Sequence, residues 1–483
     1  MNQVETFSGD GTESADLGPL TEQRVASTVH NYVRYLYEKS TAAVEIKVAI
    51  GFDGRKNSRD FASLAAEILA RNGVTVLLSS GVVPTPALSL AVRLGQCTSG
   101  IMITGGSKSA DRNGFEFRTS SGGRLARTEH SRLQSTSSGA GRHLPNLPLK
   151  APAIVSIVDF LPGYVSHLET IIDIPKLTSF AQDAKNTANV LIDSMGGAGQ
   201  TVIEDILVGA GWRAQTLFSV PEERFFDRKP EPQPGNLHAL MYNVRVIDAQ
   251  MGIATNGDGS SCGIILGNGD WLDPQDLILS LLRHLKLRKG WTGSFLMPAY
   301  VTDRATLACD LWDIPRVDTF FGFAEGDRKA GKWMFGVDGM GQHCFGKSTP
   351  DCDGILTGLL VAEMVAMEGP YLSDMVREMH EAVGDSSYGS ADLPMTMTNF
   401  NSVLPSIRTA PPMSDAKWPS PQIRAFEHAG VVKGFKLSWG QSRWLLGQIQ
   451  PFEGTIQLRA EAKSSAELGL LLSAGKRIFR SAK

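Results

Sequence analysis

The chain has 483 residues, too many for one ordinary hydrophobic core, and this length favours three or four domains. Its apolar content of 42%, charged content of 20% and net charge of -3 are those of a globular protein, with no excess of charge that would attract nucleic acid or an anionic membrane. The polar N-terminus lacks a signal-peptide core and the apolar runs are too short to span a membrane, so we expect a cytoplasmic protein.

The five cysteines are scattered along the chain and form no CxxC pair. This usage predicts reduced thiols, with neither a disulfide framework nor a zinc site. Cys344 and Cys352 lie close together in the sequence, near His343, but paired zinc ligands are normally spaced more tightly. We therefore expect no metal at these residues.

The first part of the chain alternates between helical and strand patterns. The predicted strands are 47–52, 74–78 and 101–104, and the predicted helices are 21–38, 59–72 and 84–94. This order predicts an α/β domain with a mostly parallel sheet. A stretch rich in serine, glycine and arginine, 119–142, is predicted to be a surface loop that leads to the first domain boundary.

The same alternation recurs twice, and a different pattern then follows. A second unit has predicted strands at 189–193, 251–255 and 263–266 and helices at 201–209 and 274–285. A third has strands at 293–297 and 317–321, a helix at 302–311, a glycine-rich loop at 336–346 and a helix at 354–367. The last part has strands at 435–438, 444–448 and 455–460 and a helix from Ala466, which predicts a small α+β domain.

Seven short motifs punctuate these units. They are GFDGRKNSRDF at 51–61, VVPTPAL at 82–88, GIMITGG with NGFEF at 100–117, DSMGGAG at 193–199, DRKPEPQPGNL at 227–237, MGIATNGDG at 251–259 and DGILTGLLVAEMVA at 353–366. With these motifs in this order, the chain resembles the α-D-phosphohexomutases, the phosphoglucomutase and phosphomannomutase superfamily. The resemblance implies an α/β fold of three mixed α/β domains and a C-terminal α+β domain around a central cleft. It places the four domains at 1–150, 151–268, 269–385 and 386–483.

The family's chemistry moves a phosphoryl group between C1 and C6 of a hexose phosphate, through a phosphoserine, Mg²⁺ and a bisphosphorylated intermediate. Its phosphoserine loop reads T-(A/G)-S-H-N-P before an N-G pair. An ungapped match from Thr104 to Asn113 puts Gly106 at the phosphoserine position, and glycine has no oxygen to phosphorylate. A slip of one residue would instead make Ser107 the nucleophile, with Lys108 beside it. The other interpretation is a structural loop whose serines only satisfy backbone groups.

The family's metal loop reads D-G-D-x-D-R, and its counterpart here is NGDGSS at 256–261. Asn256 and Asp258 are the candidate metal ligands, but only Asp258 keeps a charge. Mg²⁺ is a hard cation that prefers anionic oxygens. This loop therefore predicts no metal cofactor, with Mg²⁺ required only if the chain is a divergent mutase.

The remaining loops of the resemblance are altered in the same way. In the sugar loop Asp338 keeps an oxygen for a sugar hydroxyl, and His343 is a further polar candidate for substrate binding. Arg55 matches the family pattern. It is a candidate substrate contact, a residue that orients the phosphoserine loop, or simply an ion-pair partner of Asp53 or Asp60. In the phosphate loop both family arginines are replaced, by Gln448 and Gln457, which removes bidentate anion recognition.

These replacements fall on residues that carry charge or nucleophilicity, whereas the glycines, prolines and apolar runs remain. The main prediction is a phosphohexomutase-fold protein without ordinary mutase activity, which acts as a binding or regulatory partner in carbohydrate metabolism. Its expected partners are a sugar or sugar-phosphate ligand or another protein. Two alternatives stay open: an enzyme repurposed for a sugar-like substrate, and a divergent phosphoglucomutase or phosphomannomutase that uses Ser107. The sequence alone leaves open whether the chain is an enzyme.

Overall fold

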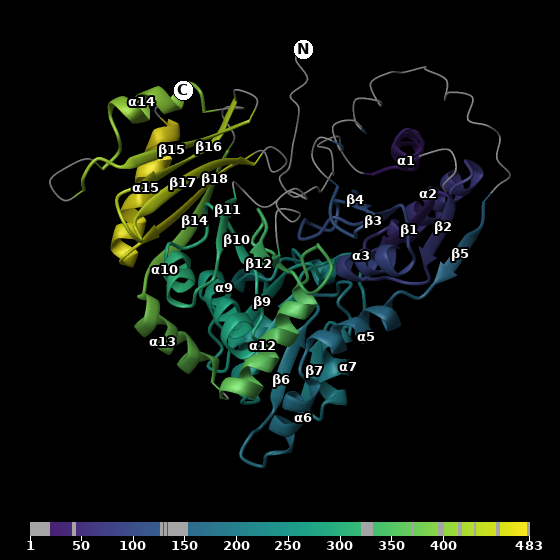
Figure 1. Ribbon diagram of the computed structural model, residues 1–483, viewed down its shortest axis with the longest axis horizontal. Helices are drawn as coiled ribbons and strands as arrows, with labels where there is room; N and C mark the ends of the chain where they lie inside the picture. Colours follow the sequence, from purple (N-terminus) through teal and green to yellow (C-terminus); the bar gives the residue numbers. More distant parts are fainter. Residues whose placement is uncertain are drawn as a thin grey trace. The chain divides into compact units, whose positions relative to one another are not determined.

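The computed structural model describes residues 20–40, 45–125, 129, 133, 153–319, 332–369, 371–394, 400–413, 418–428, 431–450 and 455–480. The chain forms two compact units (Figure 1). Unit 1 comprises Met1–Gly9, Gln275–Phe323 and Val376–Lys483, and unit 2 comprises Asp10–Pro274 and Ala324–Met375. Most of the predicted surface loop at 119–142 lies outside the described residues. The four domain boundaries expected from the sequence stay a prediction.

Unit 2 begins with a five-stranded sheet in the order β4-β3-β1-β2-β5. Its strands are β1 (Lys47–Phe52), β2 (Thr75–Ser79), β3 (Ser99–Ile103), β4 (Phe115–Thr119) and β5 (Val155–Val158). All pairs are parallel except β3–β4, so the predicted mostly parallel sheet is confirmed. The helices are α1 (Glu22–Lys39), α2 (Ser58–Arg71) and α3 (Thr85–Leu94). Apolar side chains of α1 and α2 pack with β1 into one core, which explains why β1 is an apolar run and does not alternate.

The second sheet of unit 2 has the order β7-β6-β8-β9. Its strands are β6 (Asn189–Asp193), β7 (Arg213–Leu217), β8 (Met251–Thr255) and β9 (Cys262–Leu266). The antiparallel β8–β9 hairpin carries the 256–261 loop at its tip. The accompanying helices are α5 (Leu161–Ile171), α6 (Ile174–Gln182), α7 (Val202–Gly209), α8 (His238–Val246) and α12 (Gly354–Glu368), with short turns η2 (Phe225–Asp227) and η3 (Pro234–Asn236).

Unit 2 also contains a hairpin where the sequence predicted a glycine-rich loop at 336–346. Strands β12 (Trp333–Val337) and β13 (His343–Phe345) pair antiparallel around a turn at 338–342, so that prediction is wrong. The apolar residues of both strands are buried, and the rings of Phe335 and Phe345 lie 5.4 Å apart across the pair. This packing outweighs the local preference of the glycines for a loop.

Unit 1 holds a parallel pair of strands and a five-stranded antiparallel sheet. The pair is β10 (Ser294–Pro298) and β11 (Arg316–Thr319), accompanied by α9 (Pro274–Arg283), η4 (His284–Arg288), α10 (Arg304–Leu311) and α13 (Leu372–Val383). The sheet has the order β14-β18-β17-β16-β15. Its elements are β14 (Ser387–Pro394), β15 (Gln422–His428), β16 (Val431–Ser438), β17 (Trp444–Gln450) and β18 (Thr455–Ala462), with α14 (Val403–Thr409) and α15 (Ser465–Arg480). One face of the sheet packs with α14 and α15 into a single core, as an α+β domain requires.

None of the helices in the described ranges is long and apolar enough by itself to cross a membrane. Only α12 and α13 taken together, across a bend of 84°, have the length and composition for it.

The other face of this sheet carries a buried acceptor, the carboxylate of Glu461 on β18, which is fully buried. Four groups of unit 1 donate to it: the hydroxyls of Thr302 and Ser386, the backbone N–H of Asp303 and the indole N–H of Trp444, at 2.5–2.9 Å. Hydrogen bonds to a charged group are stronger than neutral ones, and this carboxylate therefore ties β14, β17 and β18 to the segment before α10.

Replacing Glu461 with alanine is expected to lower the free energy of unfolding by roughly 2–4 kcal/mol, because four buried donors lose their acceptor at once. Urea denaturation followed by tryptophan fluorescence measures this change. Glu427→Ala, at an exposed position of β15, is the matched control and should shift stability by less than about 0.5 kcal/mol. Equal effects of the two substitutions would contradict the assigned role of Glu461.

Candidate functional site

The 104–114 loop leaves β3 and returns into β4. Gly106 has a φ of 57°, a left-handed conformation that glycine adopts without steric cost. The hydroxyl of Thr104 accepts from the backbone N–H of Gly106 at 2.9 Å and donates to a carboxylate oxygen of Asp53 at 2.7 Å. This turn leaves the side chains of Ser107 and Lys108 half-buried beyond it.

Arg55 is 3% exposed and lies beneath this loop. Its guanidinium donates to the backbone carbonyl oxygens of Gly106, Lys108 and Ser109 at 2.7–2.9 Å. Its Nε donates to Asp53 at 2.9 Å. The sequence left three roles open for Arg55. These contacts show that it both pairs with Asp53 and holds the loop, while a direct contact with substrate stays a prediction.

The 256–261 loop of the β8–β9 hairpin lies directly against the 104–114 loop. The side-chain Nδ2 of Asn256 donates to the Oγ of Ser107 at 3.0 Å. The approach is close, because a Cβ on Gly257 would lie 2.8 Å from the carbonyl oxygen of Gly106. The hydroxyl at 107, and not the glycine at 106, is therefore the side chain that meets the predicted metal loop.

The predicted metal ligand Asp258 is 1% exposed and is bound on both carboxylate oxygens. Oδ1 accepts from the hydroxyl of Ser260 at 2.6 Å, and Oδ2 accepts from the hydroxyl of Thr85 at 2.6 Å. Thr85 begins α3, so this carboxylate joins the hairpin to the first sheet's helix layer. No local pattern marks Thr85 as a partner, because the two residues are far apart along the chain.

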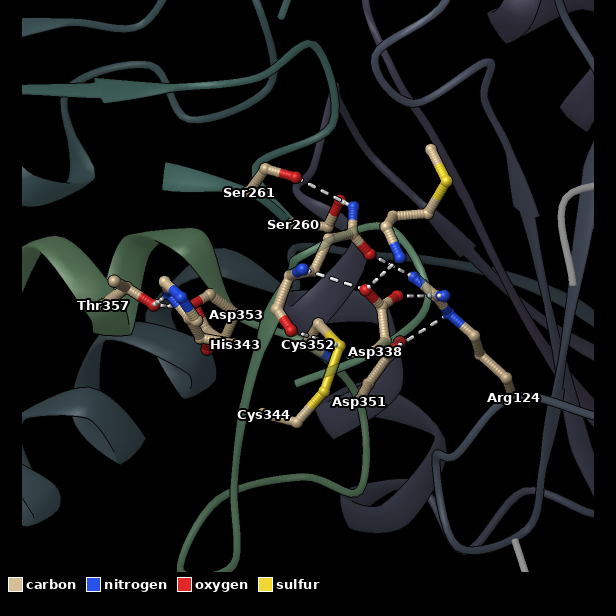
Figure 2. The surroundings of a disulfide bond; sticks show 12 residues. Arg124, Ser260, Ser261, Asp338, His343, Cys344, Asp351, Cys352, Asp353 and Thr357 are labelled. Atoms are coloured by element: carbon tan, nitrogen blue, oxygen red, sulfur yellow. Dashed lines mark hydrogen bonds and ion pairs between the residues drawn. A yellow bond between two sulfur atoms is a disulfide. The ribbon is translucent and has the colours of Figure 1, made fainter. Parts of the chain in front are cut away.

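The 338–342 turn reaches the same loop through Gln342. Its Nε2 donates to the hydroxyls of Ser260 and Ser261 at 2.8 and 2.9 Å. Its Oε1 accepts from Arg124 at 2.7 Å, and Arg124 also binds Asp338 at 2.9 Å (Figure 2). Three loops from distant parts of unit 2 thus meet around the hydroxyl groups at 107, 260 and 261.

The predicted sugar contacts Asp338 and His343 both have structural partners. Oδ1 of Asp338 accepts from the backbone N–H groups of Met340 and Gln342 at 2.9 Å, and its Oδ2 binds Arg124. His343 is 3% exposed, and its Nδ1 lies 3.4 Å from the hydroxyl of Thr357. Asp338 therefore shapes its own turn, and sugar binding by either residue stays a prediction.

Cys344 and Cys352 form a disulfide, so the prediction of reduced thiols is wrong for this pair (Figure 2). The two residues face each other as an antiparallel bridge at a Cα–Cα distance of 4.1 Å. The sequence alone did not predict the disulfide, because the pairing depends on the β12–β13 hairpin, and the glycines of that stretch indicated a loop. Sγ of Cys352 also lies 3.8 Å from the carbonyl oxygen of Gln342, which links the disulfide to the 338–342 turn.

Asp353 caps the N-terminus of α12 by accepting from the backbone N–H of Leu356 at 2.8 Å. It also accepts from the hydroxyl of Tyr164 at 2.8 Å. Burial raises the pKa of Asp353 to about 7, because the charged form loses its hydration. Burial lowers the pKa of His343 to about 4 for the same reason, so this histidine is neutral near pH 7.

In unit 1, Gln448 and Gln457 face each other across β17 and β18. Gln448 is 7% exposed, and its Oε1 has no partner among the described residues. Arg459 lies two residues further along β18, is 9% exposed, and has its guanidinium carbon 4.0 Å from the centre of the Tyr300 ring. The residues 451–454, between these strands, lie outside the described ranges.

The chain matches two sequence models of one family. Residues 5–139 match phosphoglucomutase/phosphomannomutase, alpha/beta/alpha domain I, and residues 162–269 match domain II, together just over half of the chain. The chain belongs to the α-D-phosphohexomutase superfamily. The fold and family expected from the seven motifs are thereby confirmed.

Similar phosphohexomutases cover most of the chain. A probable phosphoglucosamine mutase of Methanothermobacter thermautotrophicus is 27% identical over 434 residues and covers 86% of both chains. Phosphomannomutase/phosphoglucomutase of Pseudomonas aeruginosa is 26% identical over 54% of this chain and 53% of its own. The crystal structure of a putative phosphomannomutase from Thermus thermophilus has a TM-score of 0.78 at 22% identity, covering 99% of this chain and 100% of that one.

The main functional prediction, a phosphohexomutase fold without mutase activity that serves as a binding or regulatory partner, is wrong. The relatives that span most of the chain are named as mutases, and they favour the alternative of a divergent mutase. That prediction depended in part on the ungapped match, which put Gly106 at the phosphoserine position. The side chain that contacts the 256–261 loop is that of Ser107, one residue later.

One structural neighbour carries a metal: N-acetylphosphoglucosamine mutase of Aspergillus fumigatus, in complex with GlcNAc-6P and magnesium. It has a TM-score of 0.50 and 12% identity, over 94% of this chain and 99% of that one. In this chain the matching donors do not fit Mg²⁺ as arranged. Both oxygens of Asp258 hold hydroxyl groups, and Asn256 turns N–H groups toward Ser107. Among the described residues, no group of three or more His, Cys, Asp or Glu side chains is placed to hold a metal ion.

The disulfide predicts the number of reactive thiols. Denatured without reductant, the chain should react at three cysteines, Cys97, Cys262 and Cys309, and at all five after reduction. Maleimide labelling followed by intact-mass measurement counts them. Cys352→Ser is the control, and it should give four reactive thiols without reductant. Five labels on the unreduced wild-type chain would contradict the disulfide.

The raised pKa of Asp353 predicts that the free energy of unfolding depends on pH. Its folded pKa of about 7 lies above the unfolded value, so the folded chain holds a proton that the unfolded chain loses. Its contribution is complete below the unfolded pKa and is lost as pH rises through the folded value, a change on the order of 4 kcal/mol. The lowered pKa of His343 makes the free energy of unfolding rise with pH instead, because the unfolded histidine binds a proton that the folded one does not.

The two contributions can be separated by urea denaturation of the wild type and Asp353→Asn at several pH values. Subtracting the variant's unfolding free energy from that of the wild type removes the histidine term, and the difference should fall as pH rises from 4 to 7. A difference that stays constant with pH would show that Asp353 titrates normally in the fold.

Proposed function

We propose that this phosphohexomutase moves a phosphoryl group between two oxygens of a hexose phosphate, with Ser107 as the carrier of that group. One observation supports this most directly: the Oγ of Ser107 stands at the meeting point of the 104–114 and 256–261 loops, 3.0 Å from Asn256. The names of the relatives support the reaction class. The neighbour solved with GlcNAc-6P supports a sugar phosphate as the ligand class.

The proposed step is a substitution at phosphorus. The Oγ of Ser107 attacks one phosphorus of a hexose bisphosphate, the Oγ–P bond forms, and the bond from phosphorus to the sugar oxygen breaks. The serine proton passes to that sugar oxygen, which leaves a hydroxyl group on the monophosphate. In the reverse direction, phosphoserine passes the group to the free hydroxyl of a hexose monophosphate whose phosphate is on the other sugar oxygen. The Oγ–P bond breaks, the hydroxyl proton returns to Oγ, and the bisphosphate and the free serine are regenerated. Little covalent chemistry is needed from the protein, so positioning and charge stabilisation supply most of the catalysis.

The chain's own residues supply the positioning. Arg55 fixes three carbonyl groups of the loop, and the left-handed Gly106 turns the chain so that the next side chain faces Asn256. We assign Lys108 the role of a cation that offsets the charge of the phosphoryl group. Substrate contacts by Asp338 and His343, and a cytoplasmic location, remain predictions of the sequence.

The names of the relatives make glucosamine, mannose and glucose phosphates the substrates to compare.

Ser107→Ala should abolish turnover, with a loss on the order of a thousandfold or more, because the carrier oxygen is gone. The assay couples conversion of each hexose phosphate, with glucose 1,6-bisphosphate as activator, to a dehydrogenase. Mass spectrometry of the wild type after incubation with the bisphosphate should find phosphate on Ser107. The substitution should leave the melting temperature almost unchanged, since the side chain is half-buried and small.

Ser109→Ala is the matched control, because its hydroxyl belongs to the same loop but is exposed and donates to Asp111 at 2.6 Å. It should keep wild-type turnover. Phosphate on Ser109 in place of Ser107, or full activity of Ser107→Ala, would overturn the proposed carrier. Absence of turnover with all three sugar phosphates would overturn the proposed reaction class.

A further inference from the structure

The orientation of the Asn256 side chain is fixed by its neighbours. Its Oδ1 accepts from the backbone N–H of Ser261 at 2.9 Å, and a backbone N–H can only donate. The Nδ2 group must then point the other way, toward the hydroxyls of Ser107 at 3.0 Å and Ser260 at 3.2 Å. Asn256 is fully buried and its bond to Ser260 is buried with it, whereas its bond to Ser107 lies at the partly buried edge of the loop.

A second side-chain amide is fixed by the same logic. The Oε1 of Gln342 accepts from Arg124, which has no acceptor atom, so its Nε2 must face Ser260 and Ser261. Ser260 gives its own proton to Asp258 at 2.6 Å and accepts from both amides. The 256–261 loop thus presents the N–H donor of Asn256 to Ser107, while its own hydroxyls at 260 and 261 accept from side-chain amides.

We infer that Asn256 is a catalytic residue that donates a hydrogen bond to the phosphoryl group carried by Ser107. A divalent cation could stabilise that group instead, but it would need oxygen ligands in the place where Asn256 offers N–H groups. This inference rests on the proposed function of Ser107. Before transfer, the amide N–H binds the Oγ of Ser107 and orients it. After transfer, the same N–H lies beside the new Oγ–P bond, where the charge of the phosphoryl oxygens develops. A donor that is already oriented in a buried site stabilises that charge without reorganisation.

The need for an N–H donor beside Ser107 explains why position 256 carries an amide. A carboxylate at 256 would place a negative charge next to the phosphoryl group and would need a cation to offset it. An asparagine offers N–H groups at the same point and needs no such cation. Phosphorylation of Ser107 is therefore expected to proceed without Mg²⁺.

The experiment follows phosphorylation of Ser107 by glucose 1,6-bisphosphate, using intact-mass measurement over time, in EDTA and in excess Mg²⁺. The wild type should react at similar rates in both. Asn256→Ala should slow the reaction by on the order of a hundredfold in both, because one preorganised donor is lost. Asn256→Asp should be slow in EDTA and should recover with Mg²⁺. Asn268→Ala, at an exposed turn after β9, is the matched control and should behave as the wild type.

A second readout is independent of the reaction. Calorimetric titration with Mg²⁺ should detect no specific site on the wild-type chain and a site on Asn256→Asp. Wild-type phosphorylation that stops in EDTA and returns with Mg²⁺, or Mg²⁺ binding that Asn256→Ala removes, would overturn the inference while leaving Ser107 as carrier. No phosphate on Ser107 under any condition would overturn both. The wild-type comparison needs no variant, so a folding defect in one substitution leaves the test intact.

Discussion

The buried guanidinium of Arg55 is the interaction on which the candidate site depends. It sits under the 104–114 loop with one carboxylate partner, Asp53, and three carbonyl partners. An arginine is always charged, and leaving such a charge buried without its partners is strongly unfavourable, so the loop carbonyls must turn toward it. Because they turn inward, the side chains that follow Gly106 turn outward. The reactivity assigned to Ser107 is therefore a consequence of where a neighbouring cation directs the backbone.

The buried charged side chains of unit 2 mainly stabilise the fold. Arg118 is fully buried between Glu116 and Asp351, at 2.6 and 2.7 Å, and Arg124 binds Asp338 and Gln342. At Ser107, in contrast, the contact is with a neutral amide. The sequence showed that charged residues were missing from the family positions, and the structure shows charged residues that build the walls of the same site. A loop that has lost its charged residues can thus still be held in place by charged residues from other elements.

The sequence predicted the central elements well and the edges poorly. Strands β1, β6 and β8 were predicted to the residue, because buried strands of a parallel sheet are continuous apolar runs bounded by turns. Of the strands that the sequence missed, β5, β7, β14 and β15 lie at the edge of a sheet, whereas β12 and β13 form the hairpin that was predicted as a glycine-rich loop. An edge strand is half exposed and is ordered by pairing with its neighbour, so it needs no apolar run of its own. The ladder from β14 to β18 is an example, since its sequence SYGSADLP contains glycine and proline and little apolar surface.

In the candidate site, too, the partners of single residues could not be predicted from the local sequence. The motifs located the loops, but their partners come from other elements: only the fold brings Thr85 to Asp258, Gln342 to Ser260, and Arg124 to Gln342. Arg124 lies in a stretch that reads as an exposed loop, so nothing in its local sequence marks it as structural.

The register at Ser107 shows why position in an alignment and position in space can differ by one residue. An ungapped match counts residues between two anchors, Thr104 and Asn113, and so assigns the reactive position to Gly106. The direction of a side chain depends on the backbone dihedrals before it, and a left-handed residue reverses the local course of the chain. With Gly106 at a φ of 57°, the residue that faces the 256–261 loop is the next one. Gly106 is thus the residue whose left-handed conformation precedes the side chain that contacts the 256–261 loop, a role that its missing oxygen does not reveal.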